Sequence, residues 1–209
     1  MSRIDFSAHR LPPGRHGLPA SYVAENQRWR LLCAAAEVFA ERGYVRTSSR
    51  VISERAAVSR ATFYRYFDGV DSCLLAAHGV AVDCLWELVS AAFAGAGEWL
   101  ERLCAALEAA FDFLLSEPAL ACLLGAELPA GVAAAAPARE RLLERFAAML
   151  REARVQPLEP GHGSLPHTEL HLVAATFALL GDRAGAGGLE SLPALTTELT
   201  EILSGASVA

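Results

Sequence analysis

The sequence predicts an all-α protein, with a small N-terminal domain of three helices followed by a larger helical domain. Apolar residues recur three and four positions apart through most of the chain, which is the spacing of one helix face. Ala, Leu, Glu and Arg are abundant, and runs of β-branched residues are scarce. Glycine and proline clusters separate the periodic segments. With 209 residues, 53% of them hydrophobic, the chain is long enough for one substantial core and a small module.

Residues 1–24 are expected to form a flexible basic arm. They carry scattered arginines and the turn-rich stretch 12–17, with little periodicity before Tyr22. Two interpretations stay open. The arm is a disordered terminus, or its Arg10 or Arg15 reaches the minor groove or backbone of a bound duplex.

Residues 25–69 hold three helical periods separated by two turn signals. Gly43 ends the first helix. A hydroxyl of Thr47 or Ser48 is expected to cap the second helix, in which Glu54 and Arg55 face solvent. After a break at residues 57–58, Ser59 is expected to cap the third. The predicted buried stripe of the first helix consists of Trp29, Leu32, Cys33, Ala36, Phe39 and Ala40.

The third period predicts a DNA-reading helix. Phe63 and Phe67, four residues apart, would point back at the first helix and so fix which face looks outward. The outward face combines hydrogen-bond donors with small and phenolic side chains, which suit a major groove and its phosphates. The predicted DNA-binding residues are Thr47, Ser48, Ser59, Arg60, Ala61, Thr62, Tyr64, Arg65 and Tyr66.

Separate roles are predicted within this set. Arg60, with Arg65 as a second candidate, would read bases, most plausibly guanine. Ala61 and Tyr64 would contact thymine methyl groups. The predicted phosphate contacts are Thr47, Thr62, Tyr64 and Tyr66.

These elements resemble the N-terminal pattern of the TetR family of transcriptional regulators. The pattern here comprises Gly43–Tyr44, Thr47, Ile52, Val58–Ser59 and Thr62–Phe67, and it covers about a quarter of the chain. Three positions depart from the family's pattern. Ala57 replaces the usual turn Gly, Ser49 replaces an aliphatic residue of the second helix, and Val70 replaces a Lys, which puts one phosphate contact in question.

The net charge of −6 is divided unevenly along the chain. Residues 1–67 contain eleven Arg against five acidic residues, and residues 68–209 contain seven Arg against nineteen. The basic half is the predicted DNA-binding half, and the acidic half should be repelled by phosphate. Lys is absent, and we interpret the exclusive use of Arg as the effect of a GC-rich genome rather than of function.

Residues 70–209 are expected to form a helical ligand-binding and dimerisation domain, as the resemblance implies. The helices are expected at roughly 70–94, 98–116, 118–126, 136–154, 166–184 and 192–204. The candidate pocket residues are His78, Trp86, Val89, Phe93, Trp99, Leu103, Cys104, Leu107, Phe111, Leu123 and Phe177. Such a lining favours a small apolar or aromatic effector, with His78 and Cys104 as orienting groups. For each residue, a role in the core is the alternative.

The last two helices are predicted to build a homodimer interface. Small Ala and Gly residues would permit close approach, and a two-fold dimer would read both half-sites of a palindrome. A role in the core alone stays open. The candidate interface residues are Leu172, Ala175, Thr176, Leu179, Leu195, Leu199 and Ile202.

No metal or cofactor is predicted. The five cysteines are scattered without CxxC spacing, so they are expected to be small core residues, with a thiol sensor as the alternative. His167 and His171 are spaced for zinc but lack a clear third ligand, so helix packing or a subunit contact is the preferred interpretation.

The predicted function is a cytoplasmic, ligand-responsive regulator of transcription, most plausibly a repressor that a small apolar ligand releases from a palindromic operator. No apolar run approaches the length of a membrane span, and no secretory signal is recognised. A ligand-independent or thiol-responsive DNA-binding regulator is one alternative. An all-α enzyme acting on a hydrophobic substrate is another, but no GxSxG, HExxH or glycine-rich phosphate loop occurs, so no catalytic residue is predicted.

Overall fold

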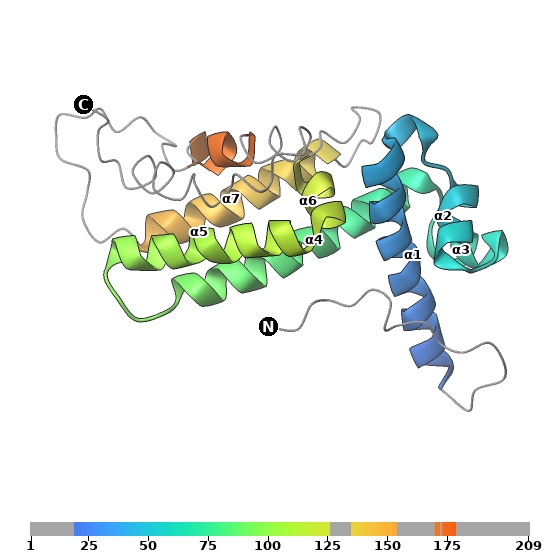
Figure 1. Cartoon of the computed structure of the whole chain (residues 1–209), viewed down its shortest axis with the longest axis horizontal. Coiled ribbons are helices and arrows are strands. Elements are labelled where there is room, and N and C mark those ends of the chain that lie inside the picture. Colours follow the sequence, from blue (N-terminus) through green and yellow to red (C-terminus); the bar gives the residue numbers. More distant parts are fainter. Residues whose placement is uncertain (1–18, 126–134, 154–169, 172, 179–209) are drawn as a thin grey trace. The chain divides into compact units, whose positions relative to one another are not determined.

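The computed structural model describes residues 19–125, 135–153, 170–171 and 173–178, and within these ranges the regular structure is helical (Figure 1). The all-α prediction is therefore confirmed. The chain forms two compact units, Met1–Val80 and Ala81–Ala209. The helices are α1 (Ala20–Arg42), the 3-10 helix η1 (Tyr44–Arg46), α2 (Ser49–Ala56), α3 (Arg60–Tyr66), α4 (Val70–Phe93), α5 (Trp99–Ser116), α6 (Pro118–Gly125) and α7 (Ala135–Ala153).

Helix α1 is the central helix of the first unit. It begins at Ala20, so residues 20–24, expected in the arm, are helical instead. Residues 31–36 and 38–39 are all buried, which is wider than the single stripe that the periodicity predicts, and Ala40 is exposed rather than buried. The reason is tertiary, since α1 packs against both α2 and α3. Residues 1–18 of the expected arm lie outside the described residues.

Gly43 ends α1 as predicted. Its φ of 71° lies in the left-handed region that favours glycine, and its amide donates to the Phe39 carbonyl at 2.8 Å. The 3-10 turn that follows was not predicted. The Tyr44 hydroxyl donates to Asp71 Oδ1 at 2.6 Å, which ties η1 to the first turn of α4 and raises the pKa of Tyr44.

Two serine caps set the starts of the next helices. Ser48 Oγ accepts from the Val51 amide at 3.3 Å, and Ser59 Oγ accepts from the Thr62 amide at 3.0 Å. Of the two cap candidates for α2, the structure selects Ser48. Each bond satisfies an amide that has no partner within the helix, so both short helices have defined first turns.

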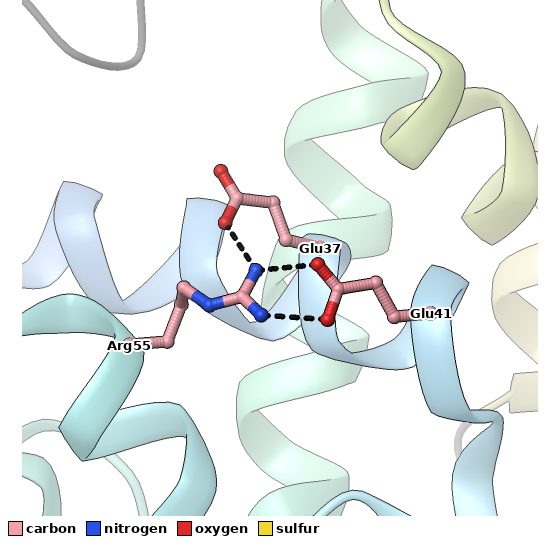
Figure 2. A network of polar contacts seen from close by, with 3 residues as sticks. All are labelled: Glu37, Glu41 and Arg55. Carbon is pink, nitrogen blue, oxygen red and sulfur yellow. Dashed lines mark hydrogen bonds and ion pairs between the residues drawn. The ribbon is translucent and has the colours of Figure 1, made fainter.

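Arginine side chains fasten α2 to α1. Figure 2 shows Arg55 reaching from α2 to two carboxylates of α1, with Nη1 2.9 Å from Glu37 Oε2 and Nη2 2.6 Å from Glu41 Oε2. Arg30, also on α1, donates from Nη2 to the Ala56 carbonyl and, at 3.1 Å, to the Ala57 carbonyl. These carbonyls lie at the C-terminal end of α2, so the Arg30 guanidinium meets the negative end of the α2 helix dipole. Arg55 faces solvent as predicted, but it also joins two helices.

The second unit contains the rest of α4 together with α5, α6 and α7. The bounds of α4 to α7 fall within one or two residues of those predicted. The predicted helix 192–204 and most of the predicted helix 166–184 lie outside the described residues. Glu98 and Glu101 form a capping box at the start of α5, in which the Glu98 amide donates to Glu101 Oε2 at 3.0 Å. Arg102 Nε donates to the Phe93 carbonyl at 2.7 Å, and its guanidinium lies over the Phe93 ring. These contacts secure the turn from which α5 runs back along α4 (Figure 1).

Helix α4 is long and apolar enough, by length and composition, to cross a membrane, with a mean hydropathy of 1.4 over an 18-residue window. The expectation that no segment meets those criteria is therefore wrong for α4. Its buried residues nevertheless recur three and four positions apart, which is the pattern of a helix packed along one side of a core. These residues are Cys73, Leu74, Ala77, His78, Ala81, Leu85, Val89 and Phe93. We therefore interpret α4 as a core helix.

Candidate functional site

Helix α3 presents a polar face because two phenylalanines hold its other face inside the first unit. Phe63 is 0% exposed and Phe67 is 5% exposed. Their rings contact each other with centroids 5.7 Å apart, four residues apart as the sequence predicts. The exposed positions are Arg60, Ala61, Tyr64 and Arg65, while Thr62 and Tyr66 are half-buried. An exposed strip of cations, a methyl group and a phenol is therefore held on a rigid element.

Tyr64 is the most constrained side chain of this face. Its hydroxyl lies 3.0 Å from Ser49 Oγ on α2, and the Arg60 guanidinium carbon lies 5.9 Å from its ring centroid. The contact with Ser49 and, to a smaller extent, the contact with Arg60 lower the pKa of Tyr64. Tyr64 and Arg60 are thus positioned together by contacts from two helices.

The other predicted hydroxyl groups are partly occupied within the protein. Thr47 is buried and donates its hydroxyl to the Gly43 carbonyl at 2.8 Å, so this proton is not directed at a phosphate. The Ser59 and Thr62 hydroxyls lie 2.8 Å apart. The Tyr66 hydroxyl donates to Gln27 Oε1 on α1 at 3.1 Å, which ties α3 to α1.

Not all arginines of the first unit are available to a partner. Arg55 is held by two glutamates and Arg50 by Glu54 at 2.8 Å. Arg46, Arg60 and Arg65 are exposed. These last three are the cations best placed to meet an anionic partner from η1 and α3, because exposed cations neutralise phosphate without first breaking an internal ion pair.

A cavity of about 70 Å³ lies within the second unit, between α4, α5, α7 and the helical residues 173–178. Its lining is almost entirely hydrocarbon and aromatic. The lining residues are Leu85, Val89, Leu103, Ala106, Leu107, Ala110, Phe111, Phe146, Met149, Leu150, Val173, Thr176 and Phe177. A cavity of this size is smaller than the roughly 300–1,000 Å³ typical of sites for drug-sized ligands, so such a ligand requires the lining to move.

The predicted pocket residues divide into two groups. Five of them line the cavity, namely Val89, Leu103, Leu107, Phe111 and Phe177. The remaining six do not, namely His78, Trp86, Phe93, Trp99, Cys104 and Leu123.

The structure shows where most of the second group lies instead. His78 is buried in the first unit and Leu123 is buried in α6. Phe93 and Trp99 pack edge to face with each other, with centroids 5.4 Å apart. Periodicity missed the contribution of α7, because its residues meet those of α5 only through tertiary packing.

Trp86 packs against the outside of the cavity wall. Its ring meets the lining residue Phe146 edge to face, with centroids 5.3 Å apart. The Arg145 guanidinium carbon lies 4.2 Å from the Trp86 centroid, and Arg145 Nη1 lies 3.2 Å from Asp83 Oδ1. Adjacent residues of α7 therefore hold Trp86 of α4 from two sides.

Comparison with known proteins agrees with this geometry. The model of the family described as bacterial regulatory proteins, tetR family, matches residues 31–77, from α1 into α4. The transcriptional activator FasR of Mycolicibacterium smegmatis is 38% identical over 90 residues, which are 43% of this chain and 41% of FasR. The matched segment thus spans less than half the length of that relative.

Solved structures match over most of the chain. A TetR-like regulator from Rhodococcus sp. RHA1 is 25% identical, with a TM-score of 0.61, and covers 90% of this chain and 97% of its own. The fatty acid degradation regulator FadR from Bacillus halodurans has a TM-score of 0.73 at 19% identity, covering 86% and 95%. FadR from Bacillus subtilis, solved with stearoyl-CoA, has a TM-score of 0.68 at 18% identity, covering 83% and 96%. Residues 31–77 therefore match the TetR family, and the described fold is similar to that of TetR-family regulators.

The matched family and the relatives named here are all described as regulators. The structure shows the conformation or the contacts of two residues that depart from the family pattern. Ala57 takes up the left-handed conformation at the end of α2 that the usual Gly would adopt, with φ 52° and ψ 46°. Ser49 places a hydroxyl beside Tyr64. For Val70, the first residue of α4, nothing in the structure explains the change.

The predicted dimer residues lie mostly outside the described residues. This applies to Leu172, Leu179, Leu195, Leu199 and Ile202. Thr176 lines the cavity, whereas Ala175 is exposed. His171 and Ala178 are exposed as well, so residues spaced along one side of this helix are open in the single chain.

The cysteines have the character of core residues. Cys33 and Cys73 are buried, the other three are half-buried, and no disulfide joins the five, all of which lie in the described part. Burial raises the pKa of Cys73 to about 12 and raises the pKa of Cys84 and Cys122. Raised values oppose the thiolate form that a redox sensor needs. Within the described residues no group of three or more His, Cys, Asp or Glu side chains is placed to hold a metal ion, and His167 lies outside them.

Proposed function

We propose that the first unit binds double-stranded DNA through α3, and that the chain regulates transcription as a homodimer on a palindromic operator. The observation that carries this proposal is the orientation of α3, in which Phe63 and Phe67 are buried while Arg60, Tyr64 and Arg65 are exposed. Arg60 would read a base edge and Tyr64 would contact a thymine methyl or a phosphate. Arg46 and Arg65 would add phosphate contacts.

We further propose that the effector is an acyl chain, free or carried by coenzyme A. The lining side chains are hydrocarbon apart from the Thr176 hydroxyl and the Met149 thioether, which suits a chain of methylene groups better than a sugar or an anion. The FadR structure from Bacillus subtilis contains stearoyl-CoA, which supports the same class. An acyl chain would enlarge the cavity by displacing aromatic lining residues.

The coupling between ligand and DNA is proposed to run along α4. This helix contributes Leu85 and Val89 to the cavity, and it is continuous with the residues that carry Asp71 beside η1. A ligand weakens DNA binding only if it binds the released arrangement more tightly, by the coupling free energy of about 1–3 kcal/mol. Under this proposal the protein acts as a repressor that its ligand releases. It would act in the cytoplasm, where the genome lies.

The DNA-binding proposal is tested by selecting duplexes from a random pool with the purified protein at one stated salt concentration. We expect enrichment of a palindrome with two equivalent half-sites. The variant Arg60→Ala should bind the selected site about 5- to 150-fold more weakly, corresponding to roughly 1–3 kcal/mol, and lose preference at one position of each half-site. Arg151→Ala, which removes an exposed cation from the second unit, is the control and should bind as the wild type does. Unchanged preference in Arg60→Ala would remove Arg60 from the reading role.

The ligand proposal is tested by adding palmitoyl-CoA, palmitate or coenzyme A alone to the protein–operator complex. Both acyl compounds should release the operator if the acyl chain is the recognised part, and coenzyme A alone should not. A Phe111→Trp variant, which fills the cavity, should keep the operator bound in their presence. Release by coenzyme A alone would show that the cavity is not the effector site.

A further inference from the structure

Ser49 is a buried residue at the start of α2 whose side chain reaches the recognition helix. It is 9% exposed, and its hydroxyl oxygen lies 3.0 Å from the phenolic oxygen of Tyr64. Tyr64 itself is 51% exposed. The oxygen of the phenol is therefore anchored on α2 while much of the ring remains open to a partner.

Arg60 approaches the same phenol from one turn earlier on α3. Its guanidinium carbon lies over the ring, 5.9 Å from the centroid, which is a cation–π contact. The Ser49 hydroxyl can donate to the phenol oxygen or accept from it. A hydrogen bond and a cation–π contact therefore connect Ser49, Tyr64 and Arg60 across two helices.

We propose that Ser49 is a positioning residue for sequence recognition, because its hydroxyl fixes Tyr64 and Tyr64 in turn fixes Arg60. This inference rests on the proposed DNA-binding function. An aliphatic side chain at this position could not hold the phenol oxygen, and Tyr64 and Arg60 would sample more rotamers before binding. Side chains that are already ordered lose less entropy on binding and discriminate better between correct and incorrect geometry.

The test compares discrimination between the selected operator and versions with one base pair changed. The proteins are the wild type, Ser49→Ala, Tyr64→Phe, the double variant and Ser49→Thr. Ser49→Ala should reduce discrimination about three- to tenfold, which is the effect of losing one hydrogen bond. Tyr64→Phe should do the same, and the double variant should lose no more than either single variant. Ser49→Thr keeps a hydroxyl and should retain discrimination.

Ser53→Ala is the matched control. Ser53 is also a buried serine of α2, but its hydroxyl donates to the Ser49 carbonyl at 2.6 Å within the same helix. It should leave discrimination unchanged. Thermal unfolding of each variant shows whether a loss of binding reflects a loss of fold.

A second readout follows the phenol directly. The difference in tyrosinate absorbance between each protein and its Tyr64→Phe counterpart reports the titration of Tyr64. Ser49→Ala should raise the pKa of Tyr64 towards its ordinary value, because the hydrogen bond from Ser49 is the largest cause lowering it. Two outcomes would overturn the role of Ser49 while leaving DNA binding intact. One is a Tyr64 titration that Ser49→Ala leaves unchanged. The other is that Ser49→Ala reduces discrimination as much in the Tyr64→Phe background as it does in the wild type. Failure of the wild type to enrich any sequence would overturn both proposals.

Discussion

Ala57 ends α2 in a left-handed backbone conformation, with φ 52° and ψ 46°. The described part of the chain contains no other non-glycine residue with positive φ. An L-residue with a Cβ pays about 1–2 kcal/mol for this conformation, which Gly adopts freely. The structure holds it there through the Val58 amide, which donates to the Ser53 carbonyl at 3.0 Å, and through Arg30, which donates to the Ala57 carbonyl.

Ala57→Gly is therefore expected to stabilise the protein by about 1 kcal/mol. The relief of backbone strain should exceed the roughly 0.4–1 kcal/mol that Gly costs through the larger entropy of the unfolded chain. Urea unfolding followed by circular dichroism measures the change. Ala61→Gly, an exposed position within α3, is the control and should destabilise the protein. A lower stability of Ala57→Gly would show that the conformation costs less than expected.

Cys73 provides a residue-scale test of thiol sensing. Its thiol is 0% exposed and lies 3.9 Å from the Leu31 carbonyl, and burial raises its pKa to about 12. Because the pKa is raised, the thiol keeps its proton at pH 8, and the reactive thiolate is scarce. In the folded protein Cys73 should stay unlabelled by iodoacetamide while the half-buried Cys122 is alkylated slowly, and both should react in denaturant. Rapid labelling of Cys73, read by mass spectrometry of peptides, would revive the thiol-sensor alternative.

At the scale of elements, the contact between α4 and α7 links the cavity to the helix that continues into the DNA-binding unit. Phe146 lines the cavity and also packs on Trp86, and Arg145 covers the same indole. A ligand that displaces Phe146 must alter its packing on α4, because close-packed side chains leave little space to absorb a shift.

Trp86→Leu is expected to weaken this link. In the wild type, the acyl ligand should change operator affinity by about 5- to 150-fold, and in the variant this ratio should fall towards one while the affinity of the unliganded protein stays similar. Fluorescence anisotropy of a labelled operator with and without palmitoyl-CoA measures both. Trp99→Leu removes an indole of α5 that packs on Phe93, and it should keep the wild-type ratio. Equal loss in both variants would assign the effect to general destabilisation.

At the scale of the whole molecule, the uneven charge predicts how DNA binding responds to salt. Residues 1–67 carry a net charge of +6 and residues 68–209 carry −12. Contacts with phosphates should therefore come from the N-terminal unit and release counterions. For six or more phosphate contacts per dimer, affinity should fall on the order of 10³-fold between 50 and 200 mM salt, measured by anisotropy at several salt concentrations. An affinity that barely changes would indicate few phosphate contacts. Arg46→Ala removes one contact from each protomer, so it should reduce the slope for the dimer by about two.

The proposed homodimer is a whole-molecule property that sedimentation at several concentrations tests. The exposed side of the helical residues 170–171 and 173–178, which includes His171 and Ala175, supports an interface there. A monomer at the concentration that binds DNA would contradict the palindromic operator as well.

The amino-acid sequence by itself determined the helices α2 to α7 and the outward face of α3. Helical periodicity and glycine, proline and hydroxyl signals act over a few residues, so they placed the bounds of α4 to α7 within one or two positions and named Ser59 as a cap. The spacing of Phe63 and Phe67 predicted which side chains of α3 look outward for the same reason.

Only the tertiary structure decided the contacts between distant segments. It showed that Arg55 and Arg30 hold α2 on α1, that Ser49 anchors Tyr64, and that α7 completes the cavity from which Trp86 and His78 are absent. The physical reason is that a periodic pattern gives the direction of a side chain relative to its own helix. It does not give the partner that another helix brings to that side.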